Sequence, residues 1–185
     1  MNKTLKNKKT KNKTRKRVFN RSEYNNGDGF LTSTWGPPLW HVLHTISFNY
    51  PVNPTYFEKK QYKNFVTNLK YILPCKYCRL NLASNFKQLP ITMKEMKNRD
   101  TFSKYIYLLH ENVNKMLKKK SNLTYCDVRE RYEHFRSRCI NKEIKQTKKK
   151  KEKGCTKPLY GKKSRCVMKI IPSTSKQKSL QIDKK

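Results

Sequence analysis

Two cysteines separated by two residues are the feature of this chain best suited to chemistry. They lie in the segment Cys75-Lys76-Tyr77-Cys78, which follows Pro74. Proline ends a preceding helix and can open the next one, so Cys75 is expected in the first turn of a helix. The positive end of the helix dipole and the charge of Lys76 both favour a thiolate there. Because thiolates attack disulfides and two cysteines at this spacing can join, the segment predicts thiol–disulfide redox chemistry.

Two other kinds of protein also use this cysteine spacing. A structural zinc site needs four ligands, yet the chain has no second Cys-x-x-Cys pair, and Cys126 and Cys139 stand alone in the sequence. A zinc site would form only if folding brought those two residues to the pair, and we predict no metal. A thioredoxin-like domain sets such a pair between strands, whereas helices are indicated on both sides here. An organic cofactor inside a helical bundle is then the expected redox partner.

The elements that must position the pair are helices, because apolar residues recur with the spacing of one helix face and no segment alternates with period two. The first predicted helix is capped by Ser33 or Thr34, has Pro37 and Pro38 in its first turn and ends before Pro51. The others cover residues 57–72, 75–88, 100–117 and 124–137, the last beginning with the capping-box pair Thr124 and Asp127. The buried face of the second helix is predicted to contain Tyr62, Phe65, Val66, Leu69 and Ile72. The pattern indicates an all-α fold, a four-helix bundle with a short fifth helix.

The charge of the chain is uneven. Its 185 residues include 45 Lys and Arg against 12 Asp and Glu, a formal net charge of +33. Residues 1–21 contain ten basic residues and no acid, and residues 141–185 contain sixteen basic residues and three acids. Such segments bury too little apolar surface to offset the entropy of ordering. We therefore expect a folded domain over residues 25–140, flanked by disordered basic arms over 1–24 and 141–185.

The basic arms can bind a polyanion, and nucleic acid, an anionic membrane face and an acidic partner are all open as their ligand. A purely solubilising or localising role is equally open. No stretch is apolar and long enough to span a bilayer, and the N-terminus lacks the apolar run of a secretory signal. The protein is therefore expected on the cytosolic side, where six cysteines indicate redox or metal chemistry rather than a secreted disulfide scaffold.

Three motifs in a fixed order extend this interpretation. They are W-x-x-L-H at residues 40–44, P-C-x-x-C at 74–78 and H-x-x-V-N-x-x-L at 110–117. In this order they resemble the Erv/ALR family of FAD-linked sulfhydryl oxidases, and the W-G-P-P-x-W opening at 35–40 is most similar to members encoded by large DNA viruses. The resemblance covers about residues 30–135. It implies a helical bundle, which is usually a homodimer in this family. If the protein is viral, it would act in the host cytoplasm or in the virion.

The resemblance also implies that FAD lies inside the bundle with its isoalloxazine ring beside the cysteine pair. Cys78 would be the thiol next to the flavin, and Cys75 the exposed thiol that exchanges with substrate. The positions that match cofactor contacts of the family, chiefly around the adenine, are Gly36, Trp40, His44, His110 and Asn114. Lys118 or Lys119 would neutralise the pyrophosphate, and Tyr132 would take the place of an aromatic ring over the cofactor.

The sequence departs from the family pattern at two places. The family usually has Asn directly after the motif histidine, but Glu111 stands there and Asn112 follows, so one cofactor contact would be lost or shifted. Many members also carry a disulfide near the end of the fourth helix. Tyr107 stands in the place of one of its cysteines, so this bridge is expected to be absent, which leaves Cys126 free or paired with Cys139.

The implied reaction begins when a dithiol of a protein substrate, such as a thioredoxin-like protein, attacks the Cys75–Cys78 disulfide at Cys75. The electrons would pass from Cys78 to FAD and then to O2, which leaves as hydrogen peroxide. Cys155 and Cys166 lie in the basic tail. They would either shuttle electrons from substrate to the pair, as a mobile cysteine pair does in some family members, or remain two thiols without a role.

An alternative from another functional class is a basic helical protein that binds nucleic acid and has no redox activity. Its support is the net charge of +33. The excess basic residues concentrate in the arms, however, whereas the motif residues lie in the predicted helices. Yellow protein that consumes oxygen with a dithiol would favour the oxidase, and colourless protein with salt-sensitive nucleic-acid binding would favour the alternative.

Overall fold

The described part of the chain is a bundle of helices with one short two-stranded ribbon beside it. The computed structural model describes residues 20–138, 155 and 157–160. Its elements are α1 (Arg21–Tyr24), α2 (Thr32–Phe48), α3 (Tyr56–Ile72), α4 (Lys76–Gln88), α5 (Arg99–Met116), α6 (Tyr125–Glu133), β1 (Ser137–Arg138) and β2 (Lys157–Pro158). The prediction of an all-α fold is confirmed, with α2 to α5 as the four-helix bundle and α6 as the short fifth helix. The sequence pattern predicts neither α1 nor the two strands.

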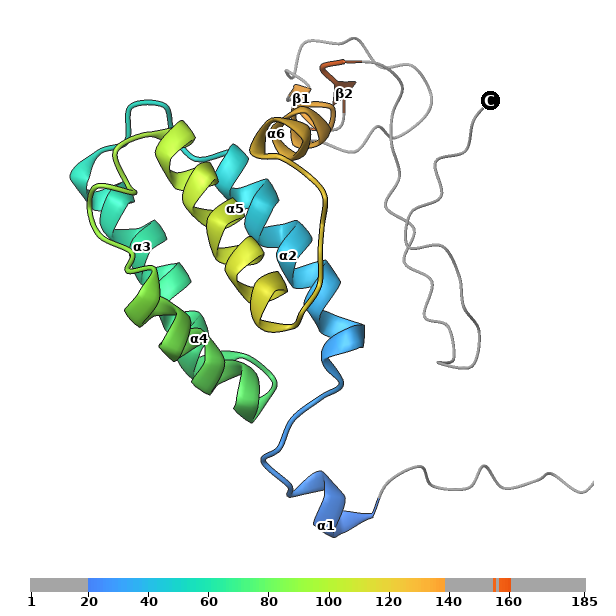
Figure 1. Ribbon diagram of the computed structural model, residues 1–185. Helices are drawn as coiled ribbons and strands as arrows, with labels where there is room; N and C mark the ends of the chain where they lie inside the picture. The colour runs from blue at the N-terminus through green and yellow to red at the C-terminus, as the bar shows by residue number, and fades with distance from the viewer. Residues whose placement is uncertain (1–19, 139–154, 156, 161–185) are drawn as a thin grey trace, which may run out of the picture.

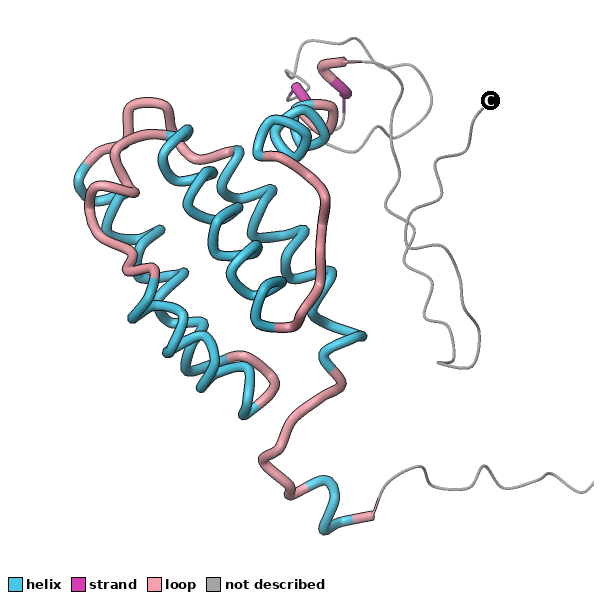
Figure 2. The backbone as a smooth tube through the Cα atoms, in the orientation of Figure 1, coloured by secondary structure: helices cyan, strands magenta, loops and turns pink. Residues whose placement is uncertain are grey.

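The four long helices form two pairs (Figure 1). α2 lies beside α5, α3 lies beside α4, and α6 packs against α2 and α5. The loop between α1 and α2 runs past the turn that joins α3 to α4, as the pink segments of Figure 2 show. This arrangement brings the segment before α2 onto the cysteine pair, which begins α4.

Side-chain caps fix where several helices begin. Thr55 and Glu58 form a capping box at the start of α3, and Thr124 and Asp127 form the predicted box at the start of α6. α5 begins after the N-cap residue Asn98, close to its predicted start. A cap satisfies amides that have no partner within the first helical turn and is worth about 1 kcal/mol. Local side-chain chemistry thus explains why these boundaries are predictable.

α2 begins earlier than the sequence predicts. Its N-cap residue is Leu31 and its first residue is Thr32, so the predicted caps Ser33 and Thr34 already lie inside the helix. The two prolines at 37 and 38 consequently lie beyond the first turn, where they were not expected. The prediction is wrong because the turn is closed by the backbone, with the Thr34 amide donating to the Leu31 carbonyl at 3.0 Å, and this bond has no side-chain signature.

The core is formed by apolar side chains of α2 to α5 and the loops between them. Its largest fully buried side chains include Tyr50, Val66, Met96, Phe102, Ile106 and Leu109. The Tyr50 hydroxyl donates to the Met96 carbonyl at 3.0 Å, which satisfies the one polar group of that ring. The predicted α3 stripe is buried at Val66 and Leu69, but Phe65 and Ile72 are 38% and 66% exposed. The prediction is wrong at these two positions because α3 is an outer helix that buries only the face turned to its neighbours.

The two short strands join the chain after α6 to a segment that the sequence assigns to the basic tail. β1 and β2 are antiparallel, with Arg138 opposite Lys157, and the Leu159 amide donates to the Arg136 carbonyl at 2.8 Å. Residues 157–160 therefore pack beside the folded domain, while almost all of both arms lies outside the described residues. Within the described residues, no helix combines the length and apolar character needed to cross a bilayer.

Candidate redox site

The cysteine pair begins helix α4. Cys75 is the N-cap residue, and its Sγ accepts a hydrogen bond from the Cys78 amide at 3.3 Å. Both side chains are half-buried and both are free thiols. Because the first amides of a helix point toward its N-cap, negative charge on the Cys75 sulfur is stabilised.

The two thiols have opposite electrostatic environments. A hydrogen bond from the Cys78 side chain is the largest of several interactions that lower the pKa of Cys75. Burial is the main cause that raises the pKa of Cys78, and the hydrogen bond to Cys75 raises it further. Cys75 is therefore the more readily ionised thiol of the reduced pair, and Cys78 the one that retains its proton more strongly. This division suits Cys75 to exchange with a thiol or disulfide from outside.

The segment of residues 28–32, here called the strap, runs across the backbone of the cysteine pair. The Phe30 amide donates to the Pro74 carbonyl at 2.7 Å, and the Lys76 amide donates to the Asp28 carbonyl at 3.2 Å. These two bonds hold the chain before α2 against the turn that precedes α4. The cysteine pair is thus fixed from both sides by backbone hydrogen bonds.

Two residues of the strap reach the pair itself. Gly29 forms an isolated β-bridge with Cys75, and a Cβ on this glycine would lie 2.3 Å from the Pro74 carbonyl oxygen. Only glycine permits so close an approach, and its φ of 104° also favours glycine. The Thr32 Oγ1 lies 3.6 Å from the Cys78 Sγ. Sequence analysis misses both contacts because they join positions about 46 residues apart with no shared motif.

A cluster of aromatic and imidazole rings forms the second part of the site. The rings are Trp40, His44 and Phe48 of α2, His110 of α5 and Tyr132 of α6. Trp40 stacks on His110 with ring centroids 4.0 Å apart and an interplanar angle of 4°. Tyr132 lies 5.2 Å from His44, measured between centroids. Four residues predicted to contact the cofactor are therefore neighbours, although they come from three helices.

His44 and His110 of this cluster are neutral near pH 7. Burial, followed by the nearby His110 and His41, lowers the pKa of His44 to about 3. Burial also lowers the pKa of His110. The Nε2 of His44 and the Nδ1 of His110 are 3.0 Å apart, so one ring donates to the other. The buried Nδ1 of His44 has no hydrogen-bond partner among the described residues, which leaves one polar atom available to a ligand.

His41 also belongs to this cluster, which the sequence does not predict because His41 occupies a variable position of the W-x-x-L-H motif. Its Nδ1 is 3.2 Å from the Tyr132 hydroxyl. The only available signal is helical spacing, since His41 is three residues from His44 on the same helix. His41 therefore helps to orient the ring of Tyr132.

The departure after the motif histidine changes the hydrogen bonds of α5. The Asn114 side-chain amide donates to Glu111 at 3.0 Å, and the Asn112 amide donates to Asn85 of α4 at 3.2 Å. Glu111 thus engages a residue predicted to contact the cofactor, while Asn112 turns toward the helix of the cysteine pair. Asn85 is buried, and its Nδ2 has no partner within the described part of the chain. The expected change in one cofactor contact stays a prediction.

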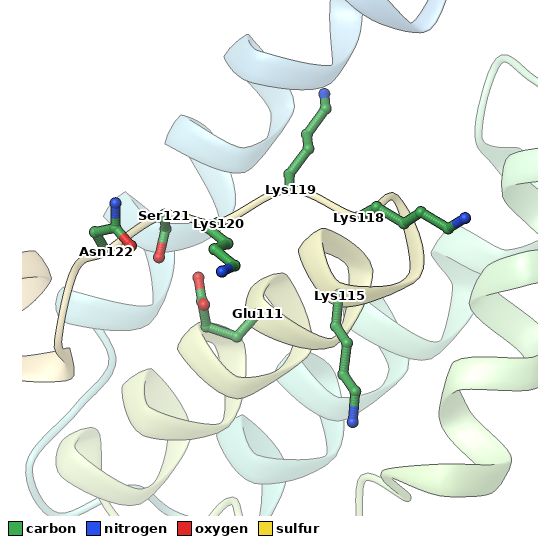
Figure 3. A pocket seen from close by; sticks show the side chains of 7 residues that line it. All are labelled: Glu111, Lys115, Lys118, Lys119, Lys120, Ser121 and Asn122. Atoms are coloured by element: carbon green, nitrogen blue, oxygen red, sulfur yellow. The ribbon is translucent and has the colours of Figure 1, made fainter.

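A lysine-rich pocket of about 480 Å³ lies at the C-terminal end of α5 (Figure 3). Its lining consists of Glu111, Lys115, Lys118, Lys119, Lys120, Ser121 and Asn122. The ammonium groups of Lys115, Lys118 and Lys119 point in different directions, whereas Lys120 extends toward Glu111. The pocket includes both lysines predicted to neutralise a pyrophosphate, and its excess of positive charge suits an anion.

Gly36 is the predicted cofactor residue that lies nearest the strap. It is buried, and a Cβ at this position would lie 3.3 Å from the Thr32 Cγ2. The observed neighbour of Gly36 is therefore the methyl group of a strap residue. A cofactor contact of Gly36 stays a prediction.

The remaining cysteines lie away from the pair or outside the described residues. Cys126 is exposed and free. The Tyr107 hydroxyl instead donates to the Leu123 carbonyl at 2.9 Å, so a hydrogen bond joins α5 to the loop before α6. Cys155 is disulfide-bonded, whereas Cys139 and Cys166 lie outside the described residues. The predicted shuttle, which includes Cys166, therefore stays a prediction. Within the described ranges, no group of three or more His, Cys, Asp or Glu could hold a metal ion.

Two viral proteins are similar in sequence to this chain. A probable FAD-linked sulfhydryl oxidase of Acanthamoeba polyphaga mimivirus is 34% identical over 99 residues, which are 54% of this chain and 68% of that protein. An FAD-linked sulfhydryl oxidase of African swine fever virus (isolate Pig/Kenya/KEN-50/1950) is 33% identical over 86 residues, 46% of this chain and 70% of that protein.

The fold has a counterpart among solved structures. The yeast Erv1 core superposes with a TM-score of 0.51 and 22% identity, covering 63% of this chain and 91% of that chain. At this level of identity the likeness concerns the fold. The model of the Erv1 / Alr family matches residues 37–138, which contain α3 to α6, most of α2 and the cysteine pair. Because this match covers more than half of the chain, the protein belongs to the Erv1/Alr family.

Proposed function

We propose that this protein is an FAD-linked sulfhydryl oxidase that forms disulfides in protein substrates through Cys75 and Cys78 and passes the electrons to O2, which becomes hydrogen peroxide. The observation that carries the proposal is the hydrogen-bonded pair at the start of α4, in which one thiol pKa is lowered and the other raised. The names of the viral relatives, both FAD-linked sulfhydryl oxidases, support it. We expect substrates on the cytosolic side, in the host cytoplasm or virion if the protein is viral.

The residues of the ring cluster fit the adenine end of FAD. The buried His44 Nδ1, which has no partner within residues 20–138, can bind a polar group of the base, and the flat faces of Trp40 and His110 can stack on it. Both imidazoles are neutral, so they can hydrogen-bond to an uncharged base without burying a charge. The chemistry that bound FAD would supply is two-electron acceptance from thiols and transfer to oxygen.

The lysine pocket fits the diphosphate of the same cofactor. Lys118 has a φ of 54°, a left-handed conformation that is unfavourable for a residue with a side chain. Helices commonly end with glycine in this conformation. A lysine at such a position indicates that its charge is useful there, since strained backbone is often retained at binding sites. We therefore assign Lys118, with Lys119 beside it, to the cofactor phosphates.

The oxidised pair would react at the half-exposed sulfur. A substrate thiolate attacks the Cys75 Sγ, a bond forms between these two sulfurs, and the Cys75–Cys78 bond breaks with Cys78 leaving as a thiolate. The second substrate thiol then attacks the mixed disulfide and releases Cys75 as a thiolate, which leaves the substrate oxidised. The helix N-terminus stabilises this second leaving group. A partner protein thus needs to reach Cys75 only.

The test is a visible absorption spectrum of the purified full chain, followed by oxygen uptake with dithiothreitol. We expect flavin bands that bleach when the dithiol is added without oxygen, and peroxide formation in air. Cys75→Ser and Cys78→Ser should each reduce oxygen uptake about a thousandfold or more, because each removes a reacting sulfur. Cys126→Ser is the matched control, since Cys126 is exposed and lies outside the site.

Two results would reject the oxidase. One is colourless protein that fails to take up FAD, especially if its single property is salt-sensitive nucleic-acid binding. The other is near-normal turnover of Cys78→Ser. Loss of activity in Cys126→Ser alone would move the reacting thiol to another part of the chain.

A further inference from the structure

We propose that Thr32 is a positioning residue for the cysteine pair, whose hydroxyl donates a hydrogen bond to the Cys78 thiolate when that thiolate leaves the disulfide. This role rests on the proposed thiol exchange at Cys75. Thr32 belongs to none of the sequence motifs and reaches the pair from another helix. The inference therefore adds a third side chain to a site that the sequence presents as two cysteines.

The contact is set by the strap. The Thr32 Oγ1 and the Cys78 Sγ are 3.6 Å apart, a distance within hydrogen-bonding range for the larger sulfur atom. Thr32 is the first residue of α2, and the backbone bond of Phe30 to Pro74, 2.7 Å long, holds the preceding chain in place. These backbone contacts do not involve the thiol groups, and they place the Thr32 hydroxyl beside Cys78.

Gly36 leaves room for the rotamer of Thr32 that directs its hydroxyl toward Cys78. It lies one helical turn after Thr32, and a Cβ there would come within 3.3 Å of the Thr32 Cγ2. The methyl group occupies the space that the glycine leaves. A larger residue at 36 would push the methyl group and turn the hydroxyl away from sulfur.

Cys78 needs such a donor more than Cys75 does. Burial and the neighbouring Cys75 both raise the pKa of Cys78, whereas the hydrogen bond from Thr32 acts in the opposite direction. The same hydroxyl is one of the smaller causes that lower the pKa of Cys75, whose largest cause is the hydrogen bond from Cys78. The titratable group that faces Cys78 is Cys75 on its own helix. The charged side chains nearest in the chain on these elements are Lys76, which is exposed, Arg79, whose guanidinium donates to the Leu73 carbonyl at 2.6 Å, and Asp28 of the strap, which is exposed.

The hydroxyl acts at a defined moment of the exchange. When a substrate thiolate bonds to Cys75, the disulfide electrons move to Cys78, which leaves as a thiolate and can no longer share a proton with Cys75. The Thr32 O–H then donates to that sulfur. Thiol–disulfide exchange is faster when the leaving thiol has a lower pKa, so this bond should speed the step.

The test compares Thr32→Val, which removes the hydroxyl and keeps the shape, with Thr32→Ser, which keeps the hydroxyl. The first measurement is the pH dependence of Cys78 alkylation by iodoacetamide, followed by peptide mass spectrometry in a Cys75→Ser background. Serine is a good N-cap, so α4 should keep its start. We expect the midpoint of the profile to move to higher pH in Thr32→Val and to stay in place in Thr32→Ser.

The second measurement is the rate at which dithiothreitol reduces the Cys75–Cys78 disulfide in the full chain with both cysteines present. Thr32→Val should slow this rate about threefold, as expected for loss of one hydrogen bond to the leaving thiolate. Thr34→Val is the matched control, because it makes the same change two residues along the same helix turn, at an exposed position.

Neither measurement needs FAD or oxygen, so they can fail independently of the oxidase proposal. The inference is overturned if Thr32→Val leaves both the alkylation midpoint and the reduction rate unchanged. It is also overturned if Thr32→Ser shifts them as far as Thr32→Val does, since shape rather than the hydroxyl would then be responsible. A Thr34→Val effect of equal size would assign the change to the helix start.

Discussion

The cysteine pair and the ring cluster lie in the same bundle but differ in solvent exposure, in charge and in the interactions that hold them. The pair is half-exposed, carries a thiol with lowered pKa and is surrounded by backbone hydrogen bonds from the strap. The ring cluster has His44 and Phe48 buried and Trp40, His110 and Tyr132 half-buried, and burial lowers the pKa values of His44 and His110. Its side chains are stacked from three helices. The first region stabilises charge, and the second excludes it.

This difference teaches which interactions each region can lose. In the proposed oxidase the reacting sulfurs must be reached by another protein, so their geometry has to be held by the main chain rather than by a closed core. In the same proposal the adenine of FAD binds at the ring cluster, and binding of an uncharged base favours burial and neutral hydrogen-bonding groups. The strap should therefore respond to changes in backbone conformation, and the ring cluster should respond to pH.

The largest effect on the first region should come from Gly29→Ala. The new Cβ would lie 2.3 Å from the Pro74 carbonyl oxygen, and a φ of 104° disfavours alanine. The strap would move away and lose its bonds to Pro74 and Lys76, so we expect the free energy of unfolding to fall by about 3 kcal/mol. Urea denaturation of the full chain measures this change.

The matched control for that prediction is Gly27→Ala, because a Cβ at Gly27 meets no atom of the described part of the chain within 4 Å. It should change stability by less than about 0.5 kcal/mol. If both variants are equally stable, the strap is not held by the close approach of Gly29. The strap would then be a loosely attached segment, and the contrast between the two regions would lose its physical basis.

The same contact shows what sequence reasoning can and cannot reach. The bounds of α3 and α5 and the start of α6 follow from apolar spacing, prolines and capping side chains, all of which act within a few residues. The predicted end of α6 at residue 137 is wrong, because the helix ends at Glu133 and Ser137 lies in β1. The pairing of Gly29 with Cys75 and the approach of Thr32 to Cys78 depend on how α2 docks on α4, which no local pattern records.

The ring cluster is predicted by the sequence less well than the helix bounds but better than the contacts of Gly29 and Thr32. Single histidines on helix faces are weak signals, and only the order of the three motifs singles out His44 and His110. Their proximity, 3.0 Å between ring nitrogens, is consistent with that resemblance. His41 and the bond between Glu111 and Asn114 depend on side-chain orientations, so the sequence does not predict them.

The ring cluster should make folding sensitive to acid. The pKa of His44 falls from 6.5 to about 3 on folding, chiefly because it is buried. A lowered folded-state pKa means that the unfolded chain binds the proton more readily below pH 6.5, so stability is present above that pH and is lost as the pH falls toward 3. From about pH 7 to about pH 5 we expect a loss of about 2 kcal/mol, measured by urea denaturation.

Substitution of His44 by glutamine should remove most of this slope, although His110 contributes in the same direction. His134→Gln is the control, since His134 is exposed and lies outside the cluster. An unchanged slope in His44→Gln would show that the cluster tolerates a charged imidazole. The ring cluster would then not differ from the cysteine pair in its tolerance of charge.

The smallest effect concerns Lys118, where stability and binding should change in opposite directions. Replacing it by glycine relieves the left-handed φ of 54° and should raise the free energy of unfolding by about 0.5–1 kcal/mol. The same change removes a positive charge from the lysine pocket, so FAD should dissociate more readily, as followed by flavin fluorescence in titrations of the apoprotein. Asn122→Gly is the control, because Asn122 has a φ of 53° in the same pocket but carries no charge. If the two variants bind FAD equally well, the charge of Lys118 has no part in holding the cofactor, and its strained conformation needs another cause.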